Sequence, residues 1–439
     1  MDGGSESGER IHDEEKHLDA SAESQHSAQD DPAASELNLR SIGVLCAGSL
    51  GLFVTVGFMN AYGVFQQYYT AHYLPDESNF QISWIGSFAS FILFAFAAPA
   101  GFLTDRVGPT VPIAIGSVLE IFAVMMISLS KKYYQFFLSQ GVLLGIGMSM
   151  VAIPVTVVIP MHFKKHRALA QGFTIAGSSL GGVIWPIALD QLLNKDGISF
   201  GWSLRIVGFI MLPLCAVVIL CTQKPAAKKD PSETQGQAKP KEKTKKDLSC
   251  LKHPSYILLC LGLAFSFFGF FTPLFYVSTY GVSLGISEST SFYLLSALNA
   301  ASLFGRILPG LVADKLGPFN VLFCASIGSA IVTFCWTAAT SLAGLIVWSI
   351  AYGFISGAIL SLQLVCATTL TTDESHGAGV GIVMASVSLT GLFGTPIAGE
   401  LVKSGYLALS CFAAATLLVG GVLLGLARLA KDRRLFVKV

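Results

Sequence analysis

The chain has 439 residues, of which 53% are hydrophobic and only 13% are charged, and its formal net charge is +1. A typical soluble domain carries about 25% charged residues. This composition therefore excludes an ordinary soluble globular protein and predicts that lipid surrounds most of the chain. The near-neutral net charge gives no reason to expect a nucleic-acid partner.

Residues 1–39 form an acidic stretch, in which eleven acidic residues stand against Arg10 and Lys16. Apolar residues are scarce in it, so it lacks the side chains needed to build a packed core. We therefore expect a disordered cytoplasmic tail over 1–39.

Twelve apolar runs follow, each able to supply the roughly 20 residues of a transmembrane helix. We expect the first six spans at 42–65, 81–103, 110–130, 135–160, 170–192 and 203–222. A polar, basic stretch separates them from the second six, which we expect at 254–277, 290–312, 318–338, 342–365, 378–399 and 405–428. The sequence thus predicts an all-α membrane protein with twelve transmembrane helices in two pseudo-symmetric six-helix halves. The expected divisions are an N-terminal half (40–222), a basic cytoplasmic linker (223–252), a C-terminal half (253–428) and a cytoplasmic tail (429–439).

Lysine and arginine predict the orientation, because short loops rich in these residues stay on the cytoplasmic side. If both termini are cytoplasmic, the outer loops hold few of the 28 basic residues, namely Lys131, Lys132, Lys195 and Lys403. We therefore expect a multi-pass protein with both termini in the cytoplasm, and we expect the plasma membrane as its location.

A short loop pattern occurs twice, after the second span of each half, at an offset of 209 residues. The pattern is G-x-x-x-D-R/K-x-G, and its residues are Gly101, Asp105, Arg106 and Gly108, then Gly310, Asp314, Lys315 and Gly317. Glycine permits a tight turn and close backbone approach, and an aspartate is suited to a helix N-terminus or a neighbouring cation. We expect these loops to latch the cytoplasmic side and to open as the halves rock. Repeats in the same orientation place the ligand site between the halves, near the bilayer midplane.

These two loops resemble the loop signature of the major facilitator superfamily. Further segments are similar to the fungal branch of the monocarboxylate-porter family, at 60–69, 82–87, 163–172, 176–182 and 305–310. The resemblance implies proton-coupled transport or exchange of small organic acids, or export of fungal metabolites. Arg306 matches an arginine in the eighth helix of that family, but Ser302 stands where lactate carriers have an acid. The first helix also lacks the lysine of lactate carriers, which favours a different cargo.

Of the ionisable residues inside predicted spans, where charge is costly and therefore indicates function, Arg306 and Glu120 are the two candidates, and Asp190 and Arg205 lie near span ends. Arg306 is suited to a two-pronged contact with a carboxylate. The alternative is that it reaches for the membrane surface, since it lies four residues before Gly310, roughly 6 Å along the helix. Glu120 is either a proton carrier or a neutral acid hydrogen-bonded to a neighbouring helix.

Neutral polar and aromatic side chains complete the predicted substrate site. Beside Arg306, this site comprises Asn60, Tyr62, Gln66, Phe271, Tyr276, Asn299, Tyr352 and Gln363. Many rings and few charges favour an amphipathic or aromatic ligand over a small anion. The alternative for each ring is helix packing or lipid contact.

Together these features predict a secondary carrier that moves a small organic molecule by alternating access, driven by a proton gradient or by the concentration gradient of the substrate. The sequence holds no phosphate-binding loop, metal-ligand cluster or soluble catalytic domain, so we expect no enzyme activity, cofactor or metal. The cargo is left open between a monocarboxylate-like acid and an exported secondary metabolite. A more remote alternative is a membrane sensor that binds ligand without moving it. We expect the carrier to work as a monomer in the bilayer.

Overall fold

The computed structural model describes residues 38–195, 197–222 and 252–434. The chain divides into two units, 1–42 and 43–439. In the first unit the description covers residues 38–42, which begin helix α3 (Leu39–Val54). The predicted tail (1–39) and linker (223–252) otherwise lie outside the described residues. Below, the N half is residues 43–222 and the C half is residues 252–434.

The N half is helical throughout, and its first, fourth and fifth spans each contain a π-helical segment. After α3 its elements are α4 (Val56–Met59), α5 (Tyr62–Tyr68), η1 (Tyr69–Tyr73), α6 (Asn79–Ala95), α7 (Ala97–Val107), α8 (Thr110–Leu129), α9 (Tyr133–Phe136), η2 (Phe137–Leu143), α10 (Leu144–His162), α11 (Arg167–Asp190), η3 (Gln191–Lys195) and α12 (Phe200–Cys221).

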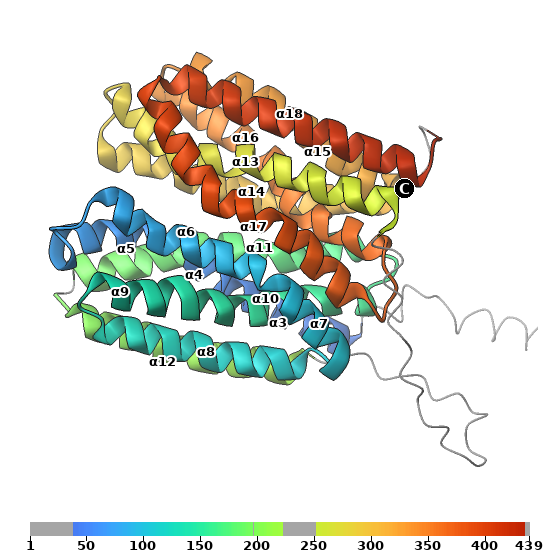
Figure 1. Ribbon diagram of the computed structural model, residues 1–439, viewed down its shortest axis with the longest axis horizontal. Helices are drawn as coiled ribbons and strands as arrows, with labels where there is room; N and C mark the ends of the chain where they lie inside the picture. Colours follow the sequence, from blue (N-terminus) through green and yellow to red (C-terminus); the bar gives the residue numbers. More distant parts are fainter. Residues whose placement is uncertain (1–37, 196, 223–251, 435–439) are drawn as a thin grey trace, which may run out of the picture. The chain divides into compact units, whose positions relative to one another are not determined.

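The C half consists of longer, less interrupted helices. They are α13 (Pro254–Ser283), α14 (Glu288–Leu316), α15 (Pro318–Phe334), the 3₁₀ turn η6 (Trp336–Ala338), α16 (Leu342–Thr369), α17 (His376–Lys403) and α18 (Tyr406–Lys431). In Figure 1 they run from yellow to red, beside the blue and green helices of the N half. The described residues contain 12 helices long and apolar enough to cross a membrane, which confirms the predicted all-α class with twelve spans.

Local chemistry fixes several helix ends. Ser287 and Ser341 each accept a hydrogen bond from a backbone N–H three residues later, which caps α14 and α16. Helices α7 and α14 end at Gly108 and Gly317, whose φ angles are 86° and 96°. A left-handed residue ends a helix and strongly favours glycine there, so these glycines are needed for the turn.

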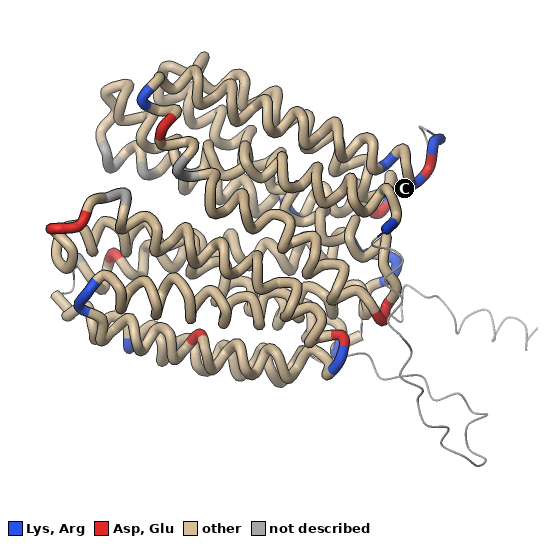
Figure 2. The backbone as a smooth tube through the Cα atoms, viewed as in Figure 1, with Lys and Arg blue, Asp and Glu red and all other residues tan. Residues whose placement is uncertain are grey.

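The pattern of charge and exposure fits a lipid environment. Figure 2 shows that charged residues gather near the helix ends, while most of the helix length is uncharged. Large apolar side chains stand on the outer surface, such as Val118 (67% exposed) and Leu220 (71% exposed). Such exposure would be unfavourable in water but is expected in a bilayer.

Two helix pairs bring the halves together: α7 with α17, and α11 with α14. We call the α7–α17 contact the first seam and the α11–α14 contact the second seam. Helix α6 also packs on α17, and α11 also packs on α16.

Candidate functional site

Asp105 joins the halves at the first seam. It lies near the end of α7, and its carboxylate accepts hydrogen bonds from the backbone N–H groups of Gly377 and Ala378, both at 2.8 Å. These N–H groups belong to the first turn of α17, where helical N–H groups have no partner within the helix. A carboxylate at this position also favourably meets the positive end of the helix dipole.

Asp314 makes the equivalent contact at the second seam. It accepts hydrogen bonds from Ala168 N at 2.9 Å and from Leu169 N at 3.1 Å. These amides belong to the first turn of α11. Each half therefore caps a helix of the other half, and the contact partners are related by the same 209-residue offset as the aspartates. The structure places the charged neighbours Arg106 and Lys315 on the exposed surface beside these caps.

Glycine allows the seam helices to approach closely. A Cβ added at Gly101 would collide with the carbonyl oxygen of Gly377, and one added at Gly310 would lie 2.6 Å from Ala168 O. Real Cβ atoms do not come so close to backbone oxygen. The first glycine of each loop pattern is therefore required by backbone packing across the seam, whereas Gly108 and Gly317 are required by their φ angles.

Arg306 adds a buried charge to the second seam. It lies on α14 and is 4% exposed. Its Nη1 donates to Ile175 O at 2.9 Å and to the hydroxyl of Ser178, both on α11 of the other half. Its Nε has no hydrogen-bond partner among the described residues. The partners described for this guanidinium are a carbonyl and a hydroxyl, neither of which carries a charge.

The depth of Arg306 differs from the sequence estimate. The predicted span ended at residue 312, whereas α14 continues to Leu316 because Gly317 ends it. Arg306 therefore lies ten residues, or about 15 Å, from the helix end. That distance is about half of a hydrocarbon core of about 30 Å. The side chain is buried against α11, so the alternative that it reaches for the membrane surface is wrong for this conformation.

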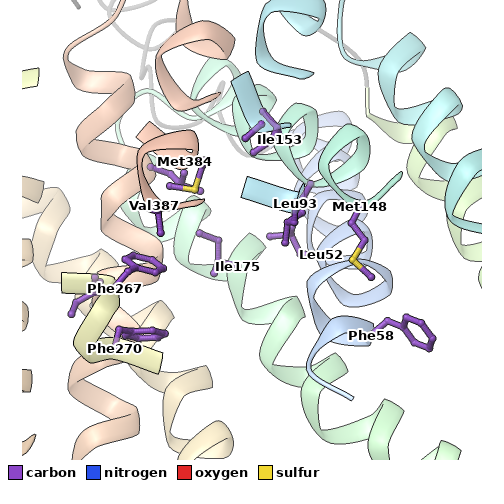
Figure 3. Close-up of a cluster of buried hydrophobic side chains, with 14 of the residues drawn as sticks. Leu52, Phe58, Leu93, Met148, Ile153, Ile175, Phe267, Phe270, Met384 and Val387 are labelled. Atoms are coloured by element: carbon purple, nitrogen blue, oxygen red, sulfur yellow. The ribbon is translucent and has the colours of Figure 1, made fainter. Parts of the chain in front are cut away.

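An apolar cluster fills the space between the halves. Figure 3 shows Ile175 between Leu52 and Leu93 of the N half and Phe267, Met384 and Val387 of the C half. The rings of Phe94 and Phe267 also meet across the halves, with centroids 6.3 Å apart. Because Ile175 both packs here and accepts from Arg306, this apolar cluster adjoins the buried guanidinium.

The predicted site residues of the first span are not gathered around Arg306. Asn60 lies between α4 and α5, is exposed, and donates from Nδ2 to Ser178 O at 3.4 Å. Tyr62 instead donates to Ile82 O of α6 and lines a cavity of about 10 Å³ inside the N half. Gln66, on α5, is half-buried. Of these three, Asn60 is therefore the residue that the structure links to Arg306, through the shared Ser178.

The predicted C-half residues divide in the same way. Tyr352 is fully buried, donates to Phe270 O at 2.8 Å and stacks on Trp348, so in this conformation it supports the interior of the C half. Gln363 is buried and its Oε1 has no partner among the described residues. The other three predicted residues lie on α13 and α14. Phe271 and Tyr276 of α13 are half-buried, and Asn299 of α14 is buried.

Glu120 lies on the side of the N half away from the seams. Helix α8 packs on α10 and α12 (Figure 1). The Glu120 side chain is fully buried, and neither carboxyl oxygen has a hydrogen-bond partner among the described residues. The predicted alternative of a hydrogen bond to a neighbouring helix is therefore not what the described structure shows.

Sequence reasoning missed the partners on α11 and α17. Ser178 binds Arg306, and the first turns of α11 and α17 receive the two aspartates. One signal was available: the first turns are themselves 209 residues apart, as Ala168 and Gly377. Ser178 carried no such signal, because its counterpart in the C half is Val387.

The chain is similar to known membrane transporters over most of its length. The Major Facilitator Superfamily profile matches residues 48–362 and 283–436. The agnestins efflux protein AgnL12 of Paecilomyces divaricatus is 47% identical, over 95% of this chain and 94% of its own length. The aspyridones efflux protein apdF of Emericella nidulans is 42% identical, over 85% of this chain and 74% of its own length.

A solved structure shows the same fold. The structure of FucP, the E. coli fucose:proton symporter, in the outward conformation aligns with a TM-score of 0.67 over 90% of this chain and 99% of its own. Its sequence identity is 16%, so the likeness concerns the fold alone.

Proposed function

Because the chain belongs to the Major Facilitator Superfamily and is a secondary transporter of small organic molecules, we propose that it exports an amphipathic secondary metabolite. The observation that carries this proposal is the 47% identity to an efflux protein over nearly the full length of both chains. A second efflux protein at 42% identity supports it. The proposal resolves the open choice of cargo in favour of the exported metabolite.

The geometry of the seams supports alternating access. In our proposal both termini are cytoplasmic, so Asp105 and Asp314 close the cytoplasmic side. Both contacts are helix caps between halves, and breaking them exposes amides that water readily solvates at a membrane surface. The seams are therefore gates that open as the halves rock. The loop residues from Gly101 to Gly108 and from Gly310 to Gly317 form the contacts that break and re-form.

The chemistry between the halves supports an amphipathic cargo. The apolar cluster around Ile175 and Phe267 suits a ring or an alkyl body. Arg306 suits an acidic or strongly accepting group, because the partners described for it are uncharged and its Nε is free to bind. When the gate opens, Arg306 leaves Ser178 and turns to the substrate, near Asn60, Gln66, Phe271, Tyr276, Asn299 and Gln363. The narrower form of this proposal, in line with the resemblance to monocarboxylate porters, is a metabolite whose carboxylate binds Arg306.

A proton gradient drives the transport. Glu120 is the proton site, because its oxygens are buried without a described partner and an ionised carboxylate there would lack solvation. The protein works as a monomer in the plasma membrane.

Reconstituted flux tests the function. The full chain is placed in proteoliposomes and offered aspyridone, an aromatic monocarboxylic acid such as benzoate, and its methyl ester, with and without a pH gradient. We expect saturable flux and counterflow of at least one acidic probe, with the ester transported more slowly because it offers Arg306 no charge. Binding without flux would instead support a sensor. Flux indifferent to the gradient would refute proton coupling, and Glu120→Gln should produce the same indifference if Glu120 carries the proton.

A further inference from the structure

A lateral groove lies on the N half, at the end of the helices opposite to the seams' aspartates. It has a volume of about 300 Å³ and lies between the end of α8 and the α9–η2 segment. Its apolar wall consists of Met126, Leu129, Leu138 and Leu143, and its polar wall includes Ser130 and Gln135. It contains none of the residues predicted for transport.

The π-helical segment η2 shapes this groove. Residues Phe137–Leu143 form wide turns within the fourth span, and Leu138 and Leu143 line the groove from there. The hydroxyl of Ser139 donates to Gln135 O at 2.7 Å, which satisfies a carbonyl of α9 just before the segment. Single π turns within α-helices occur frequently at functional sites.

The groove opens on the lipid-facing surface. Leu129 and Leu138 are both 57% exposed. Leu129 continues the exposed apolar row of α8 that includes Val118 and Phe122. An apolar hollow on this surface gains nothing from water, so hydrocarbon is the occupant that fits it.

The mouth of the groove is cationic. Lys131 and Lys132 lie between α8 and α9, and both are exposed. Their backbone N–H groups donate to Gln135 Oε1 at 2.7 and 3.0 Å, which ties the lysine loop to the groove wall. Neither ammonium group forms an ion pair with a described residue. Figure 2 shows this segment in blue at the end of the bundle.

We propose that the groove is a binding site for a glycerophospholipid. One acyl chain lies along Leu129, Leu138 and Leu143, and the phosphate lies at Lys131 and Lys132. Tyr134, which is 56% exposed beside the lysines, is an amphipathic ring suited to the headgroup level. The site is independent of the transported substrate, so the lipid proposal and the transport proposal can fail separately.

Native mass spectrometry of the full-length protein, titrated with phosphatidylglycerol, tests the site. The double variant Lys131→Ala/Lys132→Ala should bind this lipid about 30-fold more weakly, since each lysine contributes a charge-assisted contact to the phosphate. Leu138→Trp should remove the bound lipid by filling the groove. Lys403→Ala is the matched control, because Lys403 is an exposed lysine elsewhere that pairs with Glu400 at 2.7 Å, and it should leave binding unchanged.

A phospholipid with a photoreactive acyl chain locates the site without any substitution. Cross-linked peptides from 126–143 are expected, and cross-links confined to other helices would overturn the proposal. Unchanged lipid binding in both variants would overturn it too. Cross-linking of Leu138→Cys to a second copy of the chain, with no lipid adduct, would assign the groove to a dimer contact instead.

Discussion

In the first seam Gly101 faces Gly377, whereas in the second seam Gly310 faces Ala168, which already carries a Cβ. Four residues before these glycines, the first seam has Ala97 and the second has Arg306. The facing helices show the same contrast between an apolar first seam and a polar second seam. Val387 of α17 stands where α11 has Ser178. Both seams are close backbone contacts, because a Cβ at Gly172 would collide with Arg306 O just as one at Gly381 would collide with Ala97 O, but the second seam also holds polar groups.

This difference indicates that the two seams have different roles. Both seams share the aspartate cap and the glycine, which are what a symmetric gate requires. Only the second seam adds a buried charge deep between the halves, among the residues that the structure describes. We therefore propose that closure is a property of both seams and that recognition of a polar substrate group is a property of the second.

The largest effect is expected from obstructing the first seam. Gly101→Val places a branched side chain against Gly377 O, so the halves cannot close and transport should fall by about 100-fold or more. Initial flux per folded protein in proteoliposomes measures this. Gly63→Val is the control, because a Cβ at Gly63 would meet nothing within 4 Å. Flux that survives in Gly101→Val would contradict the view that this seam closes.

Arg306 should show the next largest effect. Arg306→Ala removes hydrogen bonds to α11 and the charge offered to substrate, and it should lower flux of an acidic probe by about 10- to 100-fold. Arg306→Lys should restore little, because an ammonium group cannot reproduce the planar fork of donors. Arg205→Ala, at an arginine that lies over the Trp202 ring, is the control. If the acid and its ester lose flux equally, Arg306 acts in closure and not in recognition.

The two aspartates should behave alike, although their seams differ. Asp105→Asn and Asp314→Asn each leave one acceptor oxygen for two amides, so each should weaken closure and reduce flux by about 10-fold. The double variant should be worse than either alone. A large effect at one aspartate and none at the other would show that the shared geometry does not mean shared function. The readout is counterflow at saturating probe.

The fold could be predicted from the sequence because its signals are long and repeated. Twelve apolar runs and a loop pattern repeated after 209 residues were enough for the all-α class and the two halves. Of the two partners expected for the aspartates, a helix N-terminus or a neighbouring cation, the described hydrogen bonds show the helix N-terminus. Helix ends were less accurate, as the continuation of α14 to Leu316 shows.

The site could be predicted only in part, because an apolar run shows where a helix lies but not which way each of its side chains points. Tyr62 and Tyr352 were expected to face the substrate, yet each donates to a backbone carbonyl within its own half. They stay predictions for other conformations of the carrier. The contact of Ser178 with Arg306 could not be predicted for a different reason. A serine in a glycine-rich helix looks like a small packing residue until its partner across the seam is known.

The smallest expected effect comes from making the second seam resemble the first. Ser178→Val gives α11 the residue that α17 has at the equivalent position, and it removes one of the two acceptors of Arg306 Nη1 while Ile175 O remains. The loss of one hydrogen bond to a charged donor should change flux by only about 3- to 10-fold. Ser178→Thr keeps the hydroxyl and should retain more flux, whereas Val387→Ser adds a hydroxyl at the equivalent position of α17 and should change nothing. If Ser178→Val equals Arg306→Ala in its effect, the guanidinium depends on this hydroxyl for its position, and the polar character of the second seam lies in the pair and not in the arginine alone.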